Sequence, residues 1–149
     1  MLILFFGSSI KFICSNKIKI GAYTRCAYES QFVDSNFHFV LNMKTGNVTR
    51  RESEILIGKC NWIGNRTSIT KGSKTKDFSI ICAGSLMNKD YTQNEENFIM
   101  LGGSPAKVLT SGLKRIFSTE IEKDIIYFFN NNPKANNYNL TSELSDDFK

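Results

Sequence analysis

Apolar residues recur at every sixth position in the middle of the chain. Written in sixes from Ile57, the sequence reads IGKCNW, IGNRTS, ITKGSK, TKDFSI, ICAGSL and MNKD, and the first column is apolar except at Thr75. The fifth column is small and polar: Asn61, Thr67, Ser73, Ser79 and Ser85. An amphipathic helix would space its apolar residues three and four apart, and a strand would alternate them. The pattern therefore indicates a six-residue repeat.

This repeat predicts a solenoid of short strands. If each hexad forms one strand and one corner, three hexads close a triangular coil of about eighteen residues, and coils must stack to bury their inner faces. First-column side chains then point inward, so that Ile63 lies against Ile81 and Ile69 against Met87. Fifth-column residues are small because they lie near tight corners. We expect glycines to relieve backbone strain in the turns. These are Gly58, Gly64, Gly72 and Gly84.

The repeat continues more loosely toward the N-terminus. Columns there start at Cys14, Ile20, Cys26 and Phe32. The spacing from Phe32 to Ile57 is one residue more than four hexads, which indicates an insertion. We expect residues 39–56 to leave the coil as a loop with a turn at 44–47, and long loops in compact repeat proteins are usually functional. The apolar opening, residues 1–6, is interpreted as the first strand of the core.

After Met87 the repeat breaks up, and a last apolar strand over 98–101 runs into GGSPAK. A helix is predicted from Thr119, with Thr119 and Glu122 as a capping box and Asn131-Asn132-Pro133 at its end. This helix is expected to cover the open end of the solenoid, which otherwise exposes a strand edge. The predicted fold is an all-β solenoid over 1–116, with the inserted loop 39–56, followed by a C-terminal helix and polar tail over 117–149.

Composition narrows the functional classes without deciding among them. The 149 residues carry a formal charge of +5, 41% hydrophobic residues and a single histidine. The basic residues are spread thinly, which suits an anionic small ligand such as a nucleotide cofactor. They form no long basic stripe of the kind that would indicate nucleic-acid binding. Most charge runs are solvated faces, so most of the lysines need no further role.

The cysteines and the N-terminus indicate the compartment. The four cysteines form no CxxC pair, and the apolar opening has no basic segment before it and is too short for a signal sequence or a membrane span. We therefore expect free thiols, a cytoplasmic protein and no integral membrane segment.

Four segments resemble the hexapeptide-repeat acyltransferases, in particular the O-acetyltransferases of the cell-surface polysaccharide type. IGKCNWIGNRTSITKG is similar to the coil sequence of that family, ICAGSLMNKD to its AAGSVVTKD stretch, and GGSPAKVL to the GNPAKVI that closes its last coil. DSNFHF, at 34–39, resembles the DTDFH element that carries the family's catalytic histidine. The resemblance covers residues 14–116. It implies a left-handed parallel β-helix, a homotrimer with active sites between subunits, and acetyl-CoA as the acyl donor.

The resemblance makes His38 the candidate general base. Acetyl transfer from a thioester to an alcohol needs a group that accepts the hydroxyl proton near neutral pH, and imidazole does so. An arbitrary histidine is more often structural, so the assignment depends on the match of DSNFH to the family element. Asp34 or Asn36 could orient the ring, as a partner does in a catalytic triad. Asp34 is preferred, because Asn36 stands where the family often has Asp.

The resemblance also implies a set of cofactor-binding residues. They are Trp62, Asn65, Ala83, Gly84, Lys89 and Lys107. Asn65 and Ala83-Gly84 stand where the family places backbone against CoA, and the oxyanion of acyl transfer needs an N–H aimed at it. Trp62 should point outward along the pantetheine arm or a neighbouring subunit, or else be a surface aromatic covered by the loop. Lys89 and Lys107 stand where cationic residues meet the CoA phosphates.

The predicted function is an acetyl-CoA-dependent O-acetyltransferase acting on a hydroxyl of a sugar or polysaccharide precursor. Two alternatives stay open. An N-acetyltransferase acting on an amino (nucleotide) sugar would need its acceptor ammonium to lose a proton first. A non-catalytic β-helix scaffold would use the same coils for assembly alone. No metal is expected, because a zinc site in this fold would need three histidines and the chain has one.

Overall fold

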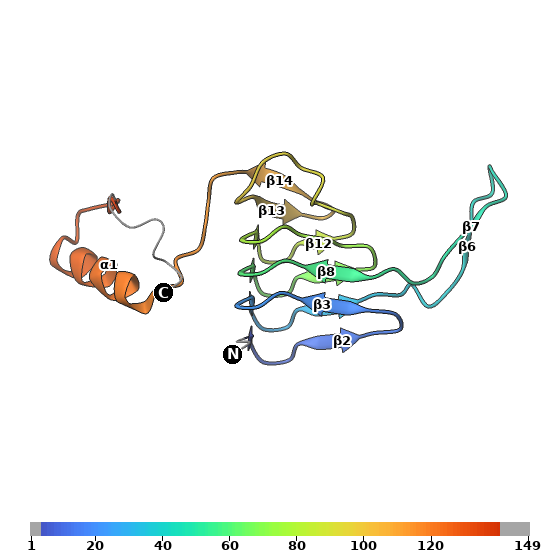
Figure 1. The fold of residues 1–149 in the computed structure, drawn as a ribbon, viewed down its shortest axis with the longest axis horizontal. Coiled ribbons are helices and arrows are strands. Elements are labelled where there is room, and N and C mark those ends of the chain that lie inside the picture. Colours follow the sequence, from blue (N-terminus) through green and yellow to red (C-terminus); the bar gives the residue numbers. More distant parts are fainter. Residues whose placement is uncertain (1–3, 141–149) are drawn as a thin grey trace. The chain divides into compact units, whose positions relative to one another are not determined.

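Strands of the first part of the chain stack in parallel, coil upon coil (Figure 1). The computed structural model describes residues 4–140; residues 1–3, at the start of the apolar opening, and residues 141–149, at the end of the polar tail, lie outside the described part. The chain forms two units, residues 1–114 and 115–149, and each is described by itself. The coils belong to the first unit.

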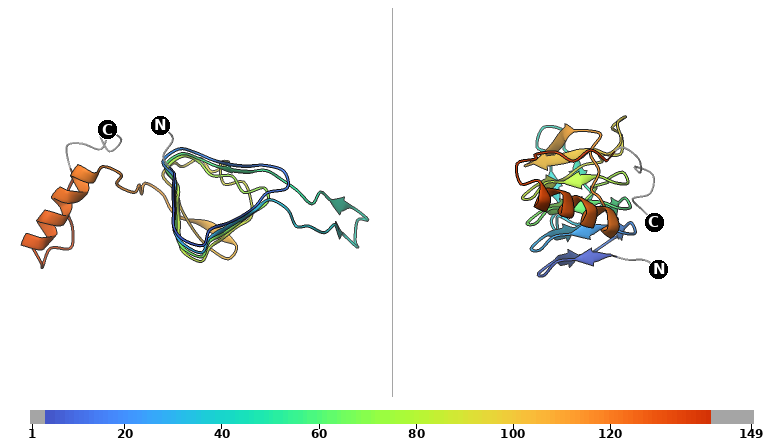
Figure 2. Two further views of the ribbon diagram at one scale, coloured as in Figure 1. Left: turned by 90° about the horizontal axis from the view of Figure 1, so that it is seen from below. Right: turned by 90° about the vertical axis from the view of Figure 1, so that its left-hand side faces the viewer.

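Three ladders of strands run along the stack. Face A holds β1 (Phe5–Phe6), β4 (Arg25–Cys26), β9 (Trp62–Ile63), β11 (Ile80–Ile81) and β13 (Met100–Gly103). Face B holds β2 (Lys11–Ile13), β5 (Gln31–Val33), β10 (Ser68–Thr70) and β12 (Leu86–Met87). Face C holds β3 (Ile18–Ile20) and β8 (Ile55–Ile57), extended by single bridges to Lys74 and Asp90. Seen along the stack, the faces enclose a triangle (Figure 2). We call its corners edges AB, BC and CA.

The strand registers confirm the stacking that the repeat predicts. Ile63 pairs with Ile81 on face A, and Ile69 pairs with Met87 on face B. The first-column residues are all buried: Ile57, Ile63, Ile69, Thr75, Ile81 and Met87. One column of the sequence therefore forms the inner lining of the stack, where most of the hydrophobic stabilisation arises.

The buried fifth-column residues hydrogen-bond to the corners. In Ser79 and Ser85, Oγ donates to the carbonyl oxygen three residues earlier, at 2.9 and 2.6 Å. Thr67 and Ser73 do the same. A short hydroxyl reaches its own corner carbonyl, and a buried polar group without such a partner would be costly. This explains why the column is both small and polar.

The turns themselves are made by the fourth column, whose φ angles lie between 55° and 78°. Its members are Cys60, Arg66, Gly72, Phe78 and Gly84. The prediction that glycine relieves turn strain is confirmed for Gly72 and Gly84, but it is wrong for Gly58 and Gly64, which have no positive φ. In those two, an added Cβ would lie 2.5 Å from the backbone of the next coil. Close contact between coils, rather than turn geometry, requires glycine there.

Between β5 and β8 the chain leaves the stack at edge BC as a projecting hairpin arm (Figures 1 and 2). Its strands, β6 (Val40–Leu41) and β7 (Val48–Thr49), pair antiparallel. The chain rejoins face C at Ile55, which pairs with Ile18 of the coil before. The register of the stack is thus maintained across the insertion.

Both ends of the stack differ from the expectations in detail. The Phe5 and Phe6 side chains of β1 are exposed, so this strand lies at the end of face A and not in the core. At the other end, β14 (Ala106–Thr110) folds back antiparallel on β13 and pairs its edge.

The predicted C-terminal helix is confirmed as α1 (Thr119–Asn131). Its N-cap is Ser118, whose hydroxyl accepts from the N–H of Ile121, so the predicted capping box at Thr119 is wrong by one residue. That α1 covers the open end of the stack stays a prediction. Within residues 4–140, no helix is long and apolar enough to cross a membrane.

Candidate functional site

Most of the predicted cofactor residues gather where face A turns into face B, at edge AB. Asn65 and Gly84 lie there on successive coils, and the Gly84 N–H donates to the Asn65 carbonyl oxygen at 2.9 Å. Ala83 and Gly84 are exposed, and an added Cβ at Gly84 would meet nothing within 4 Å. This open backbone, with no long side chain above it, suits the close approach of an extended ligand.

Trp62 and Lys107 lie next to this corner. Trp62 stands in β9 on face A between Arg25 and Ile80, and its side chain is exposed, pointing outward as the repeat predicts. Lys107, also exposed, pairs with Gly102 of β13, one residue after Leu101, which is stacked on Ile81. Five of the six predicted cofactor residues are therefore on one side of the stack.

Lys89 is the exception. It follows β12 at the opposite margin of face B, where its carbonyl oxygen accepts from the N–H of Lys74. Its ammonium lies 5.4 Å from the centre of the Tyr91 ring. Lys89 and Lys107 thus lie at different edges. That both meet the phosphates of one cofactor, in a cleft between subunits, stays a prediction.

His38 lies at the base of the arm on edge BC, and its side chain is exposed. The backbone around it is held on both sides. The His38 N–H donates to the Asn36 carbonyl oxygen at 2.7 Å, and Asn36 N–H donates to Arg51 of the returning strand. The Arg51 guanidinium donates to the Phe37 carbonyl oxygen and lies 4.8 Å from the centre of the Phe39 ring. A firmly held segment therefore presents the imidazole to solvent.

Asp34 does not orient His38 in this structure. Its buried carboxylate accepts from the backbone N–H groups of Ser15, Asn16 and Lys17, each at 2.7 Å. Burial alone would raise the pKa of Asp34, but these three donors hold the pKa below its ordinary value of 3.8. The preferred partner of His38 is thus a structural carboxylate, which holds the corner of the coil below. Among the described residues, it makes no hydrogen bond to the histidine.

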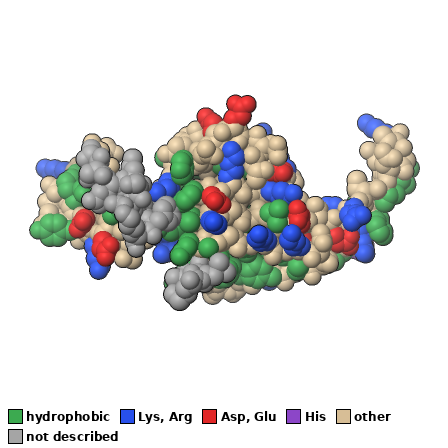
Figure 3. All heavy atoms as spheres, viewed as in Figure 1, with side chains coloured by type: hydrophobic (Ala, Val, Ile, Leu, Met, Phe, Trp, Pro, Cys, Tyr) green, Lys and Arg blue, Asp and Glu red, His purple; other side chains and the backbone are tan. Residues whose placement is uncertain are grey.

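The arm that carries His38 is apolar and exposed. Figure 3 shows hydrophobic side chains along the hairpin, with lysine and arginine among them. The most exposed of them are Phe39, Val40, Leu41, Met43 and Val48. Exposed apolar surface of this extent marks an interaction site. Within residues 4–140, no three side chains of the His, Cys, Asp or Glu type come together to hold a metal ion.

No family model and no curated protein sequence matches the chain. Among solved structures, the polysialic-acid-specific acetyltransferase NeuO matches with a TM-score of 0.70 and 19% identity, over 86% of this chain and 60% of its own. The polysialic acid O-acetyltransferase OatWY matches with a TM-score of 0.61 and 20% identity, over 86% and 64%. A galactoside acetyltransferase in complex with coenzyme A matches with a TM-score of 0.55 and 21% identity, over 72% and 55%.

The chain has the fold of these acetyltransferases. This chain spans between 55% and 64% of the length of those three structures. The structural likeness therefore supports the interpretation of the coil repeat. Arguments about the substrate and the assembly must come from the residues of this chain.

Two groups of side chains near the corners are not predicted by the sequence pattern. Arg66, next to Asn65 at edge AB, donates to Glu29 at 2.6 Å and places a cation beside the open backbone. Phe78 and Phe98 form an aromatic pair at edge CA. Arg66 and Phe78 are both in the fourth column, so a search of that column for residues that do not favour a left-handed turn would have found them.

Proposed function

We propose that this chain is an acetyl-CoA-dependent O-acetyltransferase acting on a hydroxyl of a sugar or polysaccharide precursor, and that it works as a homotrimer of left-handed parallel β-helices. The observation that carries the proposal is the division of the candidate residues between two edges. The open backbone of Ala83 and Gly84 lies at edge AB, and His38 lies at edge BC. Face B separates the two edges. Because its strands rise about 3.3 Å per residue, the edges lie several residue lengths apart.

Acyl transfer needs closer contact than one chain provides. Reacting groups must come within about 3–3.5 Å of each other. A closed ring of copies meets this requirement if the arm of one copy reaches edge AB of the next. Closed symmetry is the rule for homo-oligomers, and three copies is the number that the family resemblance implies. The exposed apolar arm supports this arrangement, because its side chains would be buried against the second copy.

In this assembly His38 accepts the proton of the acceptor hydroxyl as its oxygen attacks the acetyl carbonyl carbon. The exposed turn of Ala83 and Gly84 lets the thioester lie close to the backbone. Lys107, and Lys89 from another edge, contribute positive charge for the cofactor phosphates. An oxygen acceptor is favoured over an amine because a neutral hydroxyl needs only this one base.

Replacing His38 tests the proposal directly. His38→Ala should lower kcat for acetyl transfer to a sugar panel by about 10²–10⁴, the usual contribution of a general base. Because His38 is the only histidine, no other imidazole can replace it. The trimer, measured by light scattering, and acetyl-CoA affinity should stay close to those of the wild type.

Each alternative gives a different result. A folded His38→Ala variant with full turnover would end the catalytic assignment, and a stable monomer that still binds CoA would end the shared site. An alkali-stable amide product would indicate N-acetylation, since an ester is cleaved by base. A scaffold would show no turnover with any acceptor.

A further inference from the structure

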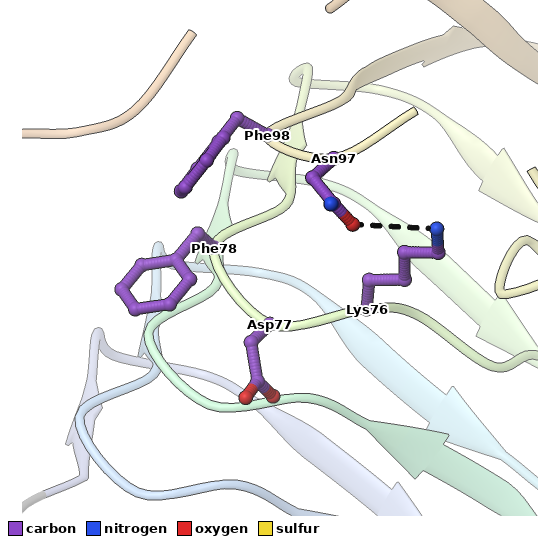
Figure 4. Close-up of a pocket in the computed structure, with 5 residues that line it drawn as sticks. All are labelled: Lys76, Asp77, Phe78, Asn97 and Phe98. Carbon is purple, nitrogen blue, oxygen red and sulfur yellow. Dashed lines mark hydrogen bonds between the residues drawn. The ribbon is translucent and has the colours of Figure 1, made fainter. Parts of the chain in front are cut away.

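A hollow of about 370 Å³ lies on edge CA, between two successive coils (Figure 4). It is lined by Lys76, Asp77, Phe78, Asn97 and Phe98. None of these residues takes part in the proposed acetyl transfer, which uses edges AB and BC. The hollow therefore needs an explanation of its own.

Two phenylalanines form one wall of the hollow. The pairing of Ile80 with Met100 puts Phe78 and Phe98 at equivalent positions of successive coils. Their ring centres lie 5.6 Å apart with an interplanar angle of 48°. Phe98 is 39% exposed, although a ring of this size is usually buried. The wall thus offers the Phe98 ring to the solvent, while the Lys114 ammonium lies 5.7 Å from the centre of the Phe78 ring.

The backbone at these rings is unfavourable for a large side chain. Phe78 has φ of 62° and Phe98 has φ of 54°. Gly or Asn adopts this left-handed conformation at lower cost. The coil requires the turn and does not require an aromatic residue in it.

Polar groups stand around the rings and are themselves held in place. The Lys76 ammonium donates to the Glu96 carbonyl oxygen at 3.1 Å and to Asn97 Oδ1 at 3.4 Å, which leaves one of its three protons for a ligand. Asp77 Oδ1 accepts from the Lys59 N–H at 2.6 Å. Figure 4 shows the two rings on one side and the Lys76–Asn97 pair on the other. Apolar surface with a few fixed polar groups is typical of a ligand site.

We propose that this hollow binds one pyranose ring of a glycan chain, as an anchoring subsite separate from the acetyl-transfer site. A pyranose has a face of C–H groups that packs on the negative face of an aromatic ring. Its hydroxyls donate and accept, which matches the carboxylate, amide and ammonium of Asp77, Asn97 and Lys76. The choice of a sugar rests on the proposed function.

The geometry disfavours a nucleotide. The rings of Phe78 and Phe98 contact each other at an angle, so no flat base fits between them. A phosphate would also meet the carboxylate of Asp77, which lines the same hollow. An uncharged sugar ring meets neither obstacle.

Binding of two neutral hexasaccharides, maltohexaose and cellohexaose, tests the subsite by calorimetry without acetyl-CoA. At least one hexasaccharide should bind the wild type, and Phe98→Asn should raise the Kd of that hexasaccharide by roughly three- to tenfold. The melting temperature of Phe98→Asn should be equal or higher, because Asn tolerates the turn. Tyr23→Asn is the matched control: Tyr23 has φ of 61° at the same corner, is exposed, and lies outside the hollow.

The control should bind both sugars as the wild type does. Failure of both hexamers to bind the wild type, or unchanged binding by Phe98→Asn, would overturn the subsite. So would a melting temperature lower in Phe98→Asn than in Tyr23→Asn, because the ring would then serve the fold. Phe98-dependent binding without any acetyl transfer would leave the subsite standing and remove the proposed function. Acetyl transfer to hexasaccharides at the same rate in Phe98→Asn as in the wild type would remove the subsite and leave the proposed function standing.

Discussion

Replacing Asp34 with Asn keeps the size of the side chain and removes its charge. The native carboxylate accepts three backbone N–H groups, from Ser15, Asn16 and Lys17. An amide offers one oxygen, and its NH₂ group would face N–H donors. Hydrogen bonds to a charged group contribute about 1.5–3 kcal/mol each, so losing one and weakening the others should cost about 2–4 kcal/mol.

The loss should be largest in the first coil, which contains the three donors. For a chain of this size, about 2–4 kcal/mol corresponds to a melting temperature lower by roughly 5–15 °C. Since every 1.4 kcal/mol is a factor of about ten, amide exchange at residues 15–17 should be faster by roughly 30- to 1,000-fold. Asp77→Asn is the control. The Asp77 carboxylate is exposed and accepts from a single backbone N–H, so this substitution should change the melting temperature less.

Acid should reduce the difference between the Asp34 variant and the wild type. The pKa of Asp34 is lowered in the folded protein, so its stabilisation is complete above the ordinary value of 3.8 and is lost as pH falls through the folded value. The two proteins should therefore converge below about pH 4. Unchanged exchange at 15–17 would refute this reasoning. If Asp34→Asn were as stable as the wild type but had a much lower kcat, Asp34 would instead have the predicted catalytic role.

Further substitutions test the core, the coil spacing and the cofactor contacts. Ile63→Ala should lower the free energy of unfolding by about 2–5 kcal/mol in denaturant titration, because this side chain is fully buried. Gly64→Ala should also destabilise, since its Cβ would lie 2.5 Å from the backbone nitrogen of Ala83; an unchanged midpoint would show that the coils can separate. Lys107→Ala and Lys89→Ala should each weaken acetyl-CoA binding by about 1 kcal/mol or more, and less at high salt. Equal affinity in both would mean that the phosphates bind elsewhere.

The inner lining of the stack could be predicted from the sequence because burial restricts it so strongly. Apolar residues fill the first column except at Thr75, and short polar side chains reach the corner carbonyls from the fifth. The fourth column gave no such signal. Cys60, Arg66 and Phe78 do not favour positive φ by themselves, and the stacking of neighbouring coils imposes it.

The candidate site was harder to predict for a related reason. His38 and Asp34 are neighbours in sequence, yet the partners of Asp34 lie one coil earlier, at Ser15, Asn16 and Lys17. A residue in a coil packs mainly against residues about eighteen positions away, so short sequence motifs say little about contacts. The assignment of residues to edges AB and BC also depends on the phase across the insertion, which the sequence leaves open.

The hairpin arm also affects the order in which the coils can form. Downstream of the arm, Trp62 pairs with Ile80, but across the arm Arg25 pairs with Trp62, at about twice the sequence separation. Doubling a closed loop costs about 0.6 kcal/mol of chain entropy, and contacts of longer range form more slowly. Pairing across the arm, at the junction between the stretches before and after it, is therefore expected to form about three times more slowly than pairing downstream. A shorter arm would speed that junction without altering either stretch.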